Sequence, residues 1–124
     1  MKPTDLESII AGALTLPMPV YAFSQAPDSL ERFDEHGVAM VIYEGSRFER
    51  KAGQTKRILE ASILMIHHDP QAIHLALHRA CAQLVAAQIN GCDTPQLLSD
   101  ELAAREDGLF QAILTLEILA FNIH

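Results

Sequence analysis

The 124-residue chain has little of three features that mark particular protein classes: cysteine, long apolar runs and positive charge. Its two cysteines, Cys81 and Cys92, are too few for a disulfide framework and favour a reducing compartment. No apolar run reaches the roughly twenty residues that a membrane helix needs, so no membrane partner is expected. The formal net charge of −7 argues against a general nucleic-acid-binding protein, because phosphate-binding domains are usually basic.

The apolar N-terminal segment, residues 8–26, lacks the features of a secretory signal. Asp5 and Glu7 lie where a signal peptide has its basic region, and Pro17 and Pro19 interrupt the apolar run. We therefore expect that the chain is not secreted through a signal peptide.

Catalytic motifs are missing as well. The sequence contains no G-x-S-x-G, no P-loop and no G-x-G-x-x-G. Cys81 and His78 are three residues apart on an expected helix, but a thiol in a helix interior gains nothing from a helix N-terminus that would make it a thiolate. The prediction is a protein without catalytic residues and without a cofactor.

The composition that remains is that of one globular domain. Hydrophobic residues make up 49% of the chain and charged residues 20%, and there is no repeat, low-complexity tract or linker. We expect a single domain over residues 1–124.

Apolar spacing predicts the elements. Helical spacing predicts helices over residues 5–15 and 70–89, and alternating or β-branched runs predict strands over residues 18–23, 38–43, 58–67 and 109–121. Residues 96–105 are good helix formers and fit either a helix or the first strand of a closing hairpin. The predicted fold class is α+β, with an antiparallel sheet of about four to five strands and two main helices packed on it.

Local signals set the expected ends of these elements. Thr4 and Glu7 have the spacing of a capping box, and Asp69 before Pro70 is a favourable N-cap. Asn90-Gly91 is a typical helix terminus. The inward stripe of the second helix is predicted to comprise Ile73, Leu77, Ala80, Leu84 and Gln88, with Ala76 and Ala87 beside it.

Four of the six histidines lie close together in the sequence, at His67, His68, His74 and His78. His74 and His78 are four residues apart and therefore share a helix face, as paired metal ligands do. Both lie on the flank of the predicted apolar stripe, where histidine needs no ligand, and no H-E-x-x-H motif is present. Metal binding by this cluster is the alternative function, and a strand exit followed by a capped helix is the preferred interpretation.

The positive charge gathers in one place. Five of the nine basic residues fall between the strands 38–43 and 58–67, in a segment predicted to be a long hairpin loop with a polar tip: Arg47, Arg50, Lys51, Lys56 and Arg57. Glu49 is the one acidic residue among them, and Phe48 adds an aromatic of the kind that interfaces use as an anchor. A basic arm on an acidic body indicates contact with a neighbouring subunit, so these residues form the predicted interface.

With these segments placed, the chain resembles the Mu-like bacteriophage tail terminators, small proteins that cap the completed tail tube. The resemblance rests on VAMVIYEGSRFE (residues 38–49), RILEASILMIH (residues 57–67), the helix opened by Asp-Pro, and LLSDELAAREDGLFQAILTLEI (residues 97–118). It covers nearly the whole chain. The chain is short for this family, so elements that contact the head side are expected to be reduced.

The resemblance implies a structural function in the virion. Subunits of such a protein close into a homo-oligomeric ring, hexameric in related terminators, that sits on the tail tube protein and offers a surface to a head-completion protein. The implied location is the cytoplasm of a bacterial host during assembly and then the virion tail of a phage or prophage. Residues 47–57 take a surface role in the ring or against the tube.

Overall fold

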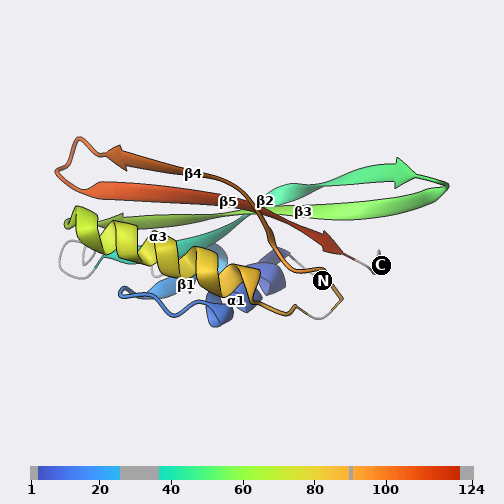
Figure 1. The fold of residues 1–124 in the computed structure, drawn as a ribbon, viewed down its shortest axis with the longest axis horizontal. Helices are drawn as coiled ribbons and strands as arrows, with labels where there is room; N and C mark the ends of the chain where they lie inside the picture. Colours follow the sequence, from blue (N-terminus) through green and yellow to red (C-terminus); the bar gives the residue numbers. More distant parts are fainter. Residues whose placement is uncertain (1–2, 26–36, 90, 121–124) are drawn as a thin grey trace.

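The computed structural model describes residues 3–25, 37–89 and 91–120. The elements of these ranges follow one another as α1 (Pro3–Ala13), β1 (Val20–Ala22), the short 3₁₀ helix η1 (Phe23–Gln25), β2 (Val38–Lys51), β3 (Gln54–His67), α3 (Pro70–Val85), β4 (Gln96–Ala104) and β5 (Phe110–Ala120). Figure 1 shows one layer of strands with the helices below it.

The strands of the described residues form one five-stranded sheet in the order β1-β2-β3-β5-β4. β1 pairs with β2 in parallel, with Val20 opposite Ala39, and every other pair is antiparallel. β2 and β3 are much longer than the rest of the sheet requires, and together they project from one end as a two-stranded ribbon (Figure 1).

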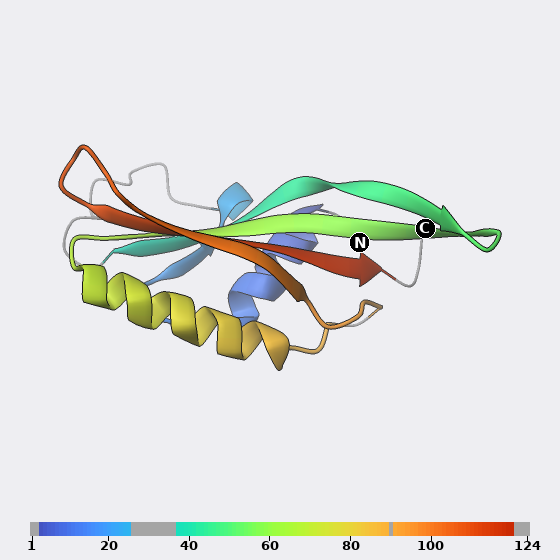
Figure 2. The same ribbon diagram turned by 45° about the horizontal axis from the view of Figure 1, so that its top comes forward.

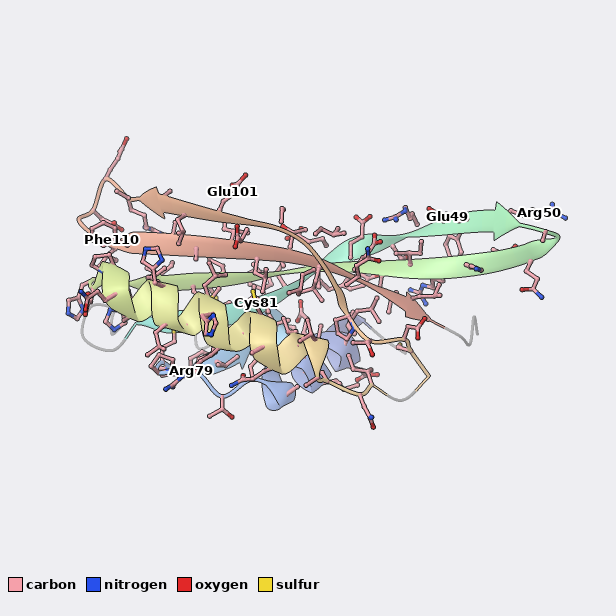
Figure 3. The ribbon with its side chains drawn as sticks, in the orientation of Figure 1. Glu49, Arg50, Arg79, Cys81, Glu101 and Phe110 are labelled. Carbon is pink, nitrogen blue, oxygen red and sulfur yellow. The ribbon has the colours of Figure 1, made fainter. Side chains whose placement is uncertain are left out.

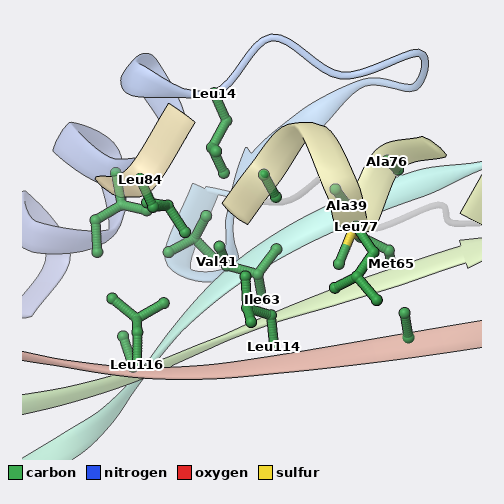
Figure 4. Close-up of a cluster of buried hydrophobic side chains, with 14 of the residues drawn as sticks. Leu14, Ala39, Val41, Ile63, Met65, Ala76, Leu77, Leu84, Leu114 and Leu116 are labelled. Atoms are coloured by element: carbon green, nitrogen blue, oxygen red, sulfur yellow. The ribbon is translucent and has the colours of Figure 1, made fainter. Parts of the chain in front are cut away.

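Both helices lie on the same face of the sheet. α3 runs along β3 and β5, and α1 lies against β1 and β2 (Figure 2). Alternate residues of the central strands point toward the helices, as strand geometry requires, and Leu14 and Leu84 face Val41, Ile63 and Leu114 in the core (Figure 4). Burial of these apolar side chains is the main stabilising term of the fold.

The predicted fold class is confirmed as α+β, and β1 makes the sheet mixed. The ambiguous segment 96–105 is a strand: β4 pairs along β5 with Leu102 opposite Ala112. Pairing with β5 decided against the local helix propensity of this segment. The predicted alternation on β5 is also confirmed, with Ala112, Leu114, Leu116 and Ile118 buried, and Phe110 packed against the core.

Asp69 is the N-cap of α3, as predicted, and its Oδ1 accepts a hydrogen bond from the backbone N–H of Gln71 at 2.9 Å. The predicted end of this helix at Asn90-Gly91 is wrong, because the helix ends at Val85 with Ala86 as C-cap. Gln88 therefore lies outside the helix and is exposed, whereas the other four residues of the predicted stripe are buried.

The predicted capping box at the first helix is wrong too. α1 already includes Pro3 and Thr4, so Thr4 is not its N-cap. The Glu7 carboxylate reaches away from the helix, with Oε1 accepting from the N–H of Ser24 at 3.0 Å and Oε2 from that of Tyr43 at 2.9 Å. Glu7 thus binds α1 to η1 and to β2.

Candidate functional site

The segment predicted as a loop, residues 47–57, is a regular β-ribbon, and we call it the arm. β2 and β3 continue through it with Arg47 opposite Ile58, Glu49 opposite Lys56 and Lys51 opposite Gln54. The pairing of β3 with β5 ends at Arg57, so the outer part of the arm consists of two strands with no third neighbour in the described residues. The predicted long hairpin is therefore confirmed, but residues 47–57 are paired strands closed by a short turn and not a loop.

A two-residue turn closes the arm. Ala52 and Gly53 have φ values of 53° and 79°, and positive φ at both central positions is the mark of the type I′ turn that suits a twisted hairpin. Gly53 adopts this conformation without cost, whereas Ala52 carries the strain of a side chain in the left-handed region. The sequence signal was weak because Ala-Gly is not a typical pair for this turn.

Arg47, at the base of the arm, is held by three carboxylates. Its guanidinium donates to Glu60, to Glu117 at 2.8 Å and to Glu49 at 3.4 Å. The hydrogen bond to Glu117 and then that to Glu60 raise the pKa of Arg47 above its ordinary value. Since β2, β3 and β5 each supply at least one member, this cluster ties the base of the arm to the sheet.

The other basic side chains of the arm are directed elsewhere. Arg50 and Lys56 are exposed and form no ion pair within the described part of the chain, and Arg57 donates from Nε to Ser46 Oγ at 3.4 Å. Lys51 lies opposite Gln54 at the outer end of the ribbon. Figure 3 shows Glu49 and Arg50 far out on the arm.

Phe48 is the aromatic residue of the arm and is 59% exposed. It lies opposite Arg57, and the alternation of the ribbon places it on the same face as Arg50. By register this face continues into the one that carries the helices, because Ser46 is opposite the buried core residue Leu59. A large apolar side chain flanked by two guanidinium groups is a typical interface anchor.

The base of the arm is fixed at the outer edge of β2. The parallel pairing with β1 stops at Val41, and the next outward N–H, that of Tyr43, donates to the Glu7 carboxylate instead. A β-bulge follows between Tyr43 and Gly45. Sequence reasoning missed this role of Glu7 because a T-x-x-E pattern does not reveal a partner 36 residues away.

At the opposite end of the molecule lies an apolar groove of about 240 Å³, between the start of α3 and the end of the β4–β5 hairpin. Its lining comprises Pro70, Ile73, His74, Leu102, Ala103, Ala104, Phe110 and Gln111. Figure 3 shows Phe110 at this end, with the arm at the other. Sequence reasoning missed the groove, since it forms only where the start of α3 packs beside the β4–β5 hairpin.

The edge of this groove is acidic. Asp100 lies on β4, and Glu106 and Asp107 lie at the turn that follows, all exposed. Arg105 pairs with Asp107 at 3.1 Å, and its hydrogen bonds lower the pKa of Asp107 below its ordinary value. The end opposite the basic arm is thus negatively charged.

The histidines that suggested a metal site are not gathered into one. His67 and His68 stack with ring centroids 4.5 Å apart, whereas His74 and His78 are exposed along α3. Among the described residues, no three His, Cys, Asp or Glu side chains lie close enough together to hold a metal ion.

The two thiols lie at the edge of the core. Burial raises the pKa of Cys81 and of Cys92, so neither is held as a thiolate. None of the helices in the described ranges is long and apolar enough to cross a membrane.

Comparison with known proteins finds the fold but no family. No protein-family model matches the sequence, and no curated protein is significantly similar to it. The structure is similar to a chain in the solved virion of a native gene transfer agent (GTA) particle, with a TM-score of 0.58 and 14% sequence identity. The likeness covers 94% of this chain and 87% of the other, and so the two chains share one fold over nearly their whole length.

Proposed function

We propose that this protein is a structural component of a phage-like virion, and specifically a tail terminator. The observation that carries the proposal is the fold shared, almost end to end, with a chain of the gene transfer agent virion. The sequence resemblance to the Mu-like tail terminators points the same way. No set of residues in the described ranges has the geometry of a metal site, and both thiols are held protonated.

In this function the subunits form a closed homo-oligomeric ring, a hexamer as in related terminators. The ring sits on the last ring of the tail tube protein, stops tube growth and offers its other face to a head-completion protein. Assembly takes place in the cytoplasm of a bacterial host and the protein ends in the virion tail.

The arm suits such a ring because it is a projection that a neighbour can hold. Its residues 47–57 carry five basic groups and one acidic group, whereas the rest of the chain carries four basic and fifteen acidic groups. Opposite charge on two parts of one surface favours association between copies and speeds it at low salt.

The first experiment is solution mass by light scattering over a concentration series, with negative-stain images of any high-mass fraction. We expect a discrete closed species with a central hole. A monomer at every concentration, or open aggregates of continuously varying mass, would contradict the proposal.

The arm is tested by charge reversal. The double variant Arg50→Glu/Lys51→Glu should weaken assembly strongly and leave the circular dichroism spectrum unchanged, because the arm lies outside the core. The single variants Arg50→Glu and Arg79→Glu make a matched pair, since Arg79 is an exposed basic residue on α3, away from the arm. If Arg50→Glu assembled as well as Arg79→Glu, the arm would have no part in the interface.

A further inference from the structure

We infer that Phe48 of one subunit inserts into the apolar groove between α3 and the β4–β5 hairpin of a second copy. This inference rests on the proposed ring and identifies the two surfaces that meet in it. The donor is the inner part of the arm around Phe48, and the acceptor is the groove lined by Ile73, Leu102 and Phe110 at the other end of the molecule.

The donor side chain is presented for insertion. Phe48 is 59% exposed and lies opposite Arg57, the last residue of β3 that pairs with β5, so a large aromatic surface remains in water in the isolated subunit. Aromatic side chains that are buried on association are among the strongest contributors to binding.

The acceptor is apolar and open. The groove has a volume of about 240 Å³, and Leu102 on its edge is 49% exposed. An apolar cleft of this kind is filled by a hydrophobic side chain in preference to water.

The groove cannot receive the Phe48 side chain of its own subunit. Phe48 lies opposite Arg57, whereas the groove residue Phe110 lies opposite His67, ten residues further along β3. At a rise of roughly 3.3 Å per residue, the two sites are about 33 Å apart along a continuous strand. A second copy must therefore provide the aromatic.

Charge complementarity identifies that partner as another copy of this chain. Arg50 and Arg57 share the face of the arm that carries Phe48. At the acceptor, Asp100 lies on the same face of β4 as Leu102. Its negative charge adds to the effect of burial in raising the pKa of Cys81 on α3, so it faces the helix side of the sheet. Glu106 and Asp107 follow at the turn. Docking of Phe48 brings basic groups to this acidic edge.

Donor and acceptor at opposite ends make the contact heterologous. Each subunit then uses a different surface toward each of its two neighbours, which is the arrangement that closes into rings or extends into filaments. The same arrangement provides a decisive test. If one variant has a defective donor and another has a defective groove, the intact donor of the second can still dock into the intact groove of the first.

The experiment uses Phe48→Ala as the variant without the aromatic and Leu102→Asp as the variant with a charged groove. Each alone should lose self-association, with the dissociation constant of the contact weakened roughly 30-fold or more. Mixed in equal amounts, they should form a 1:1 heterodimer and nothing larger, measured by sedimentation velocity. Circular dichroism and thermal unfolding of each variant check that the subunit is folded.

The chain offers matched controls for both changes. Phe23 is 57% exposed on η1 and Leu98 is 48% exposed on β4 outside the groove, so Phe23→Ala and Leu98→Asp remove or charge similar surface elsewhere. Both controls should assemble like the parent.

The outcomes separate the inference from the proposed function. Rings that persist in Phe48→Ala or in Leu102→Asp would overturn the inference and leave the terminator proposal standing. A heterodimer from the mixture, together with open filaments from the parent, would support the inference and contradict the closed ring. A parent that stays monomeric at millimolar concentration, or a mixture that stays monomeric while the parent assembles, would overturn the inference.

Discussion

The buried Glu7 carboxylate is predicted to control both the stability of the fold and the anchoring of the arm. Glu7 is only 5% exposed and accepts two backbone hydrogen bonds, from Ser24 at 3.0 Å and from Tyr43 at 2.9 Å. The Tyr43 N–H lies just beyond the last residue of β2 that β1 covers. Replacement of Glu7 by Ala therefore removes the acceptor of two donors at a strand edge.

The magnitude follows from those two bonds. A hydrogen bond to a charged group contributes about 1.5–3 kcal/mol to stability. Both donors are only partly buried, so water replaces some of the loss, and we expect Glu7→Ala to lower the free energy of unfolding by about 2–4 kcal/mol. Glu7→Gln keeps one acceptor oxygen and should lose about half of that.

The assay is urea denaturation followed by circular dichroism, supported by hydrogen exchange. In a domain of this size each kcal/mol corresponds to roughly 3–6 °C in Tm. The exchange rate of the Tyr43 amide should rise more than that of core amides in β3, because the lost contact is local. Glu101→Ala, at an exposed position of β4, is the control and should change stability by less than about 0.5 kcal/mol.

A change of less than about 0.5 kcal/mol in Glu7→Ala would refute this reasoning. It would mean that the two N–H groups find water or another acceptor at no cost. An unchanged Tyr43 exchange rate in a destabilised variant would show instead that Glu7 acts through α1 alone.

Three further predictions concern the turn of the arm, two glycines and the ion pair at the β4–β5 turn. Ala52→Asn should increase hydrogen-exchange protection across the arm, equivalent to up to about 1 kcal/mol, because asparagine tolerates positive φ better than alanine does; slower exchange confined to the arm is the expected readout. Gly37→Ala should lower the free energy of unfolding by about 2 kcal/mol or more, because φ is +70° and the new Cβ would lie 2.6 Å from a backbone oxygen of β3. The control Gly12→Ala, in α1, meets open space and should leave stability unchanged or raise it in the same denaturant assay. The pKa of Asp107 is lowered, so its contribution to the stability of the turn is fully present above its ordinary pKa of 3.8 and is lost as the pH falls through the folded pKa. Arg105→Gln should raise the pKa of Asp107 in an NMR titration. An unchanged pKa would disprove the pairing.

The long apolar strands and the second helix could be predicted from the sequence because their signals are local. β5 alternates residue by residue, and Asp69-Pro70 both caps and starts α3. The fold class followed from these elements, since each has one apolar face that must be buried against another. The position of the basic segment between two strands was equally evident.

Other features depended on partners that no local pattern reveals. Residues 96–105 are a strand because the edge of β5 was available to pair with them. Glu7 accepts a hydrogen bond from β2 and does not cap its own helix, because folding brings the Tyr43 N–H beside its carboxylate. Whether β2 and β3 would form a loop or a ribbon over residues 47–57 depended on the register that the core sets and the turn at Ala52-Gly53 completes.

The sequence by itself thus determined the α+β class, the single acidic domain and the concentration of positive charge in one hairpin. These properties depend on composition and on short-range periodicity, and both are complete in the chain before it folds. Only the tertiary structure decided that the hairpin is a paired two-stranded arm, that Arg47 is neutralised at its base, and that an apolar groove with an acidic edge lies at the far end. Each of these depends on residues far apart in the sequence, which meet only when the sheet and helices pack.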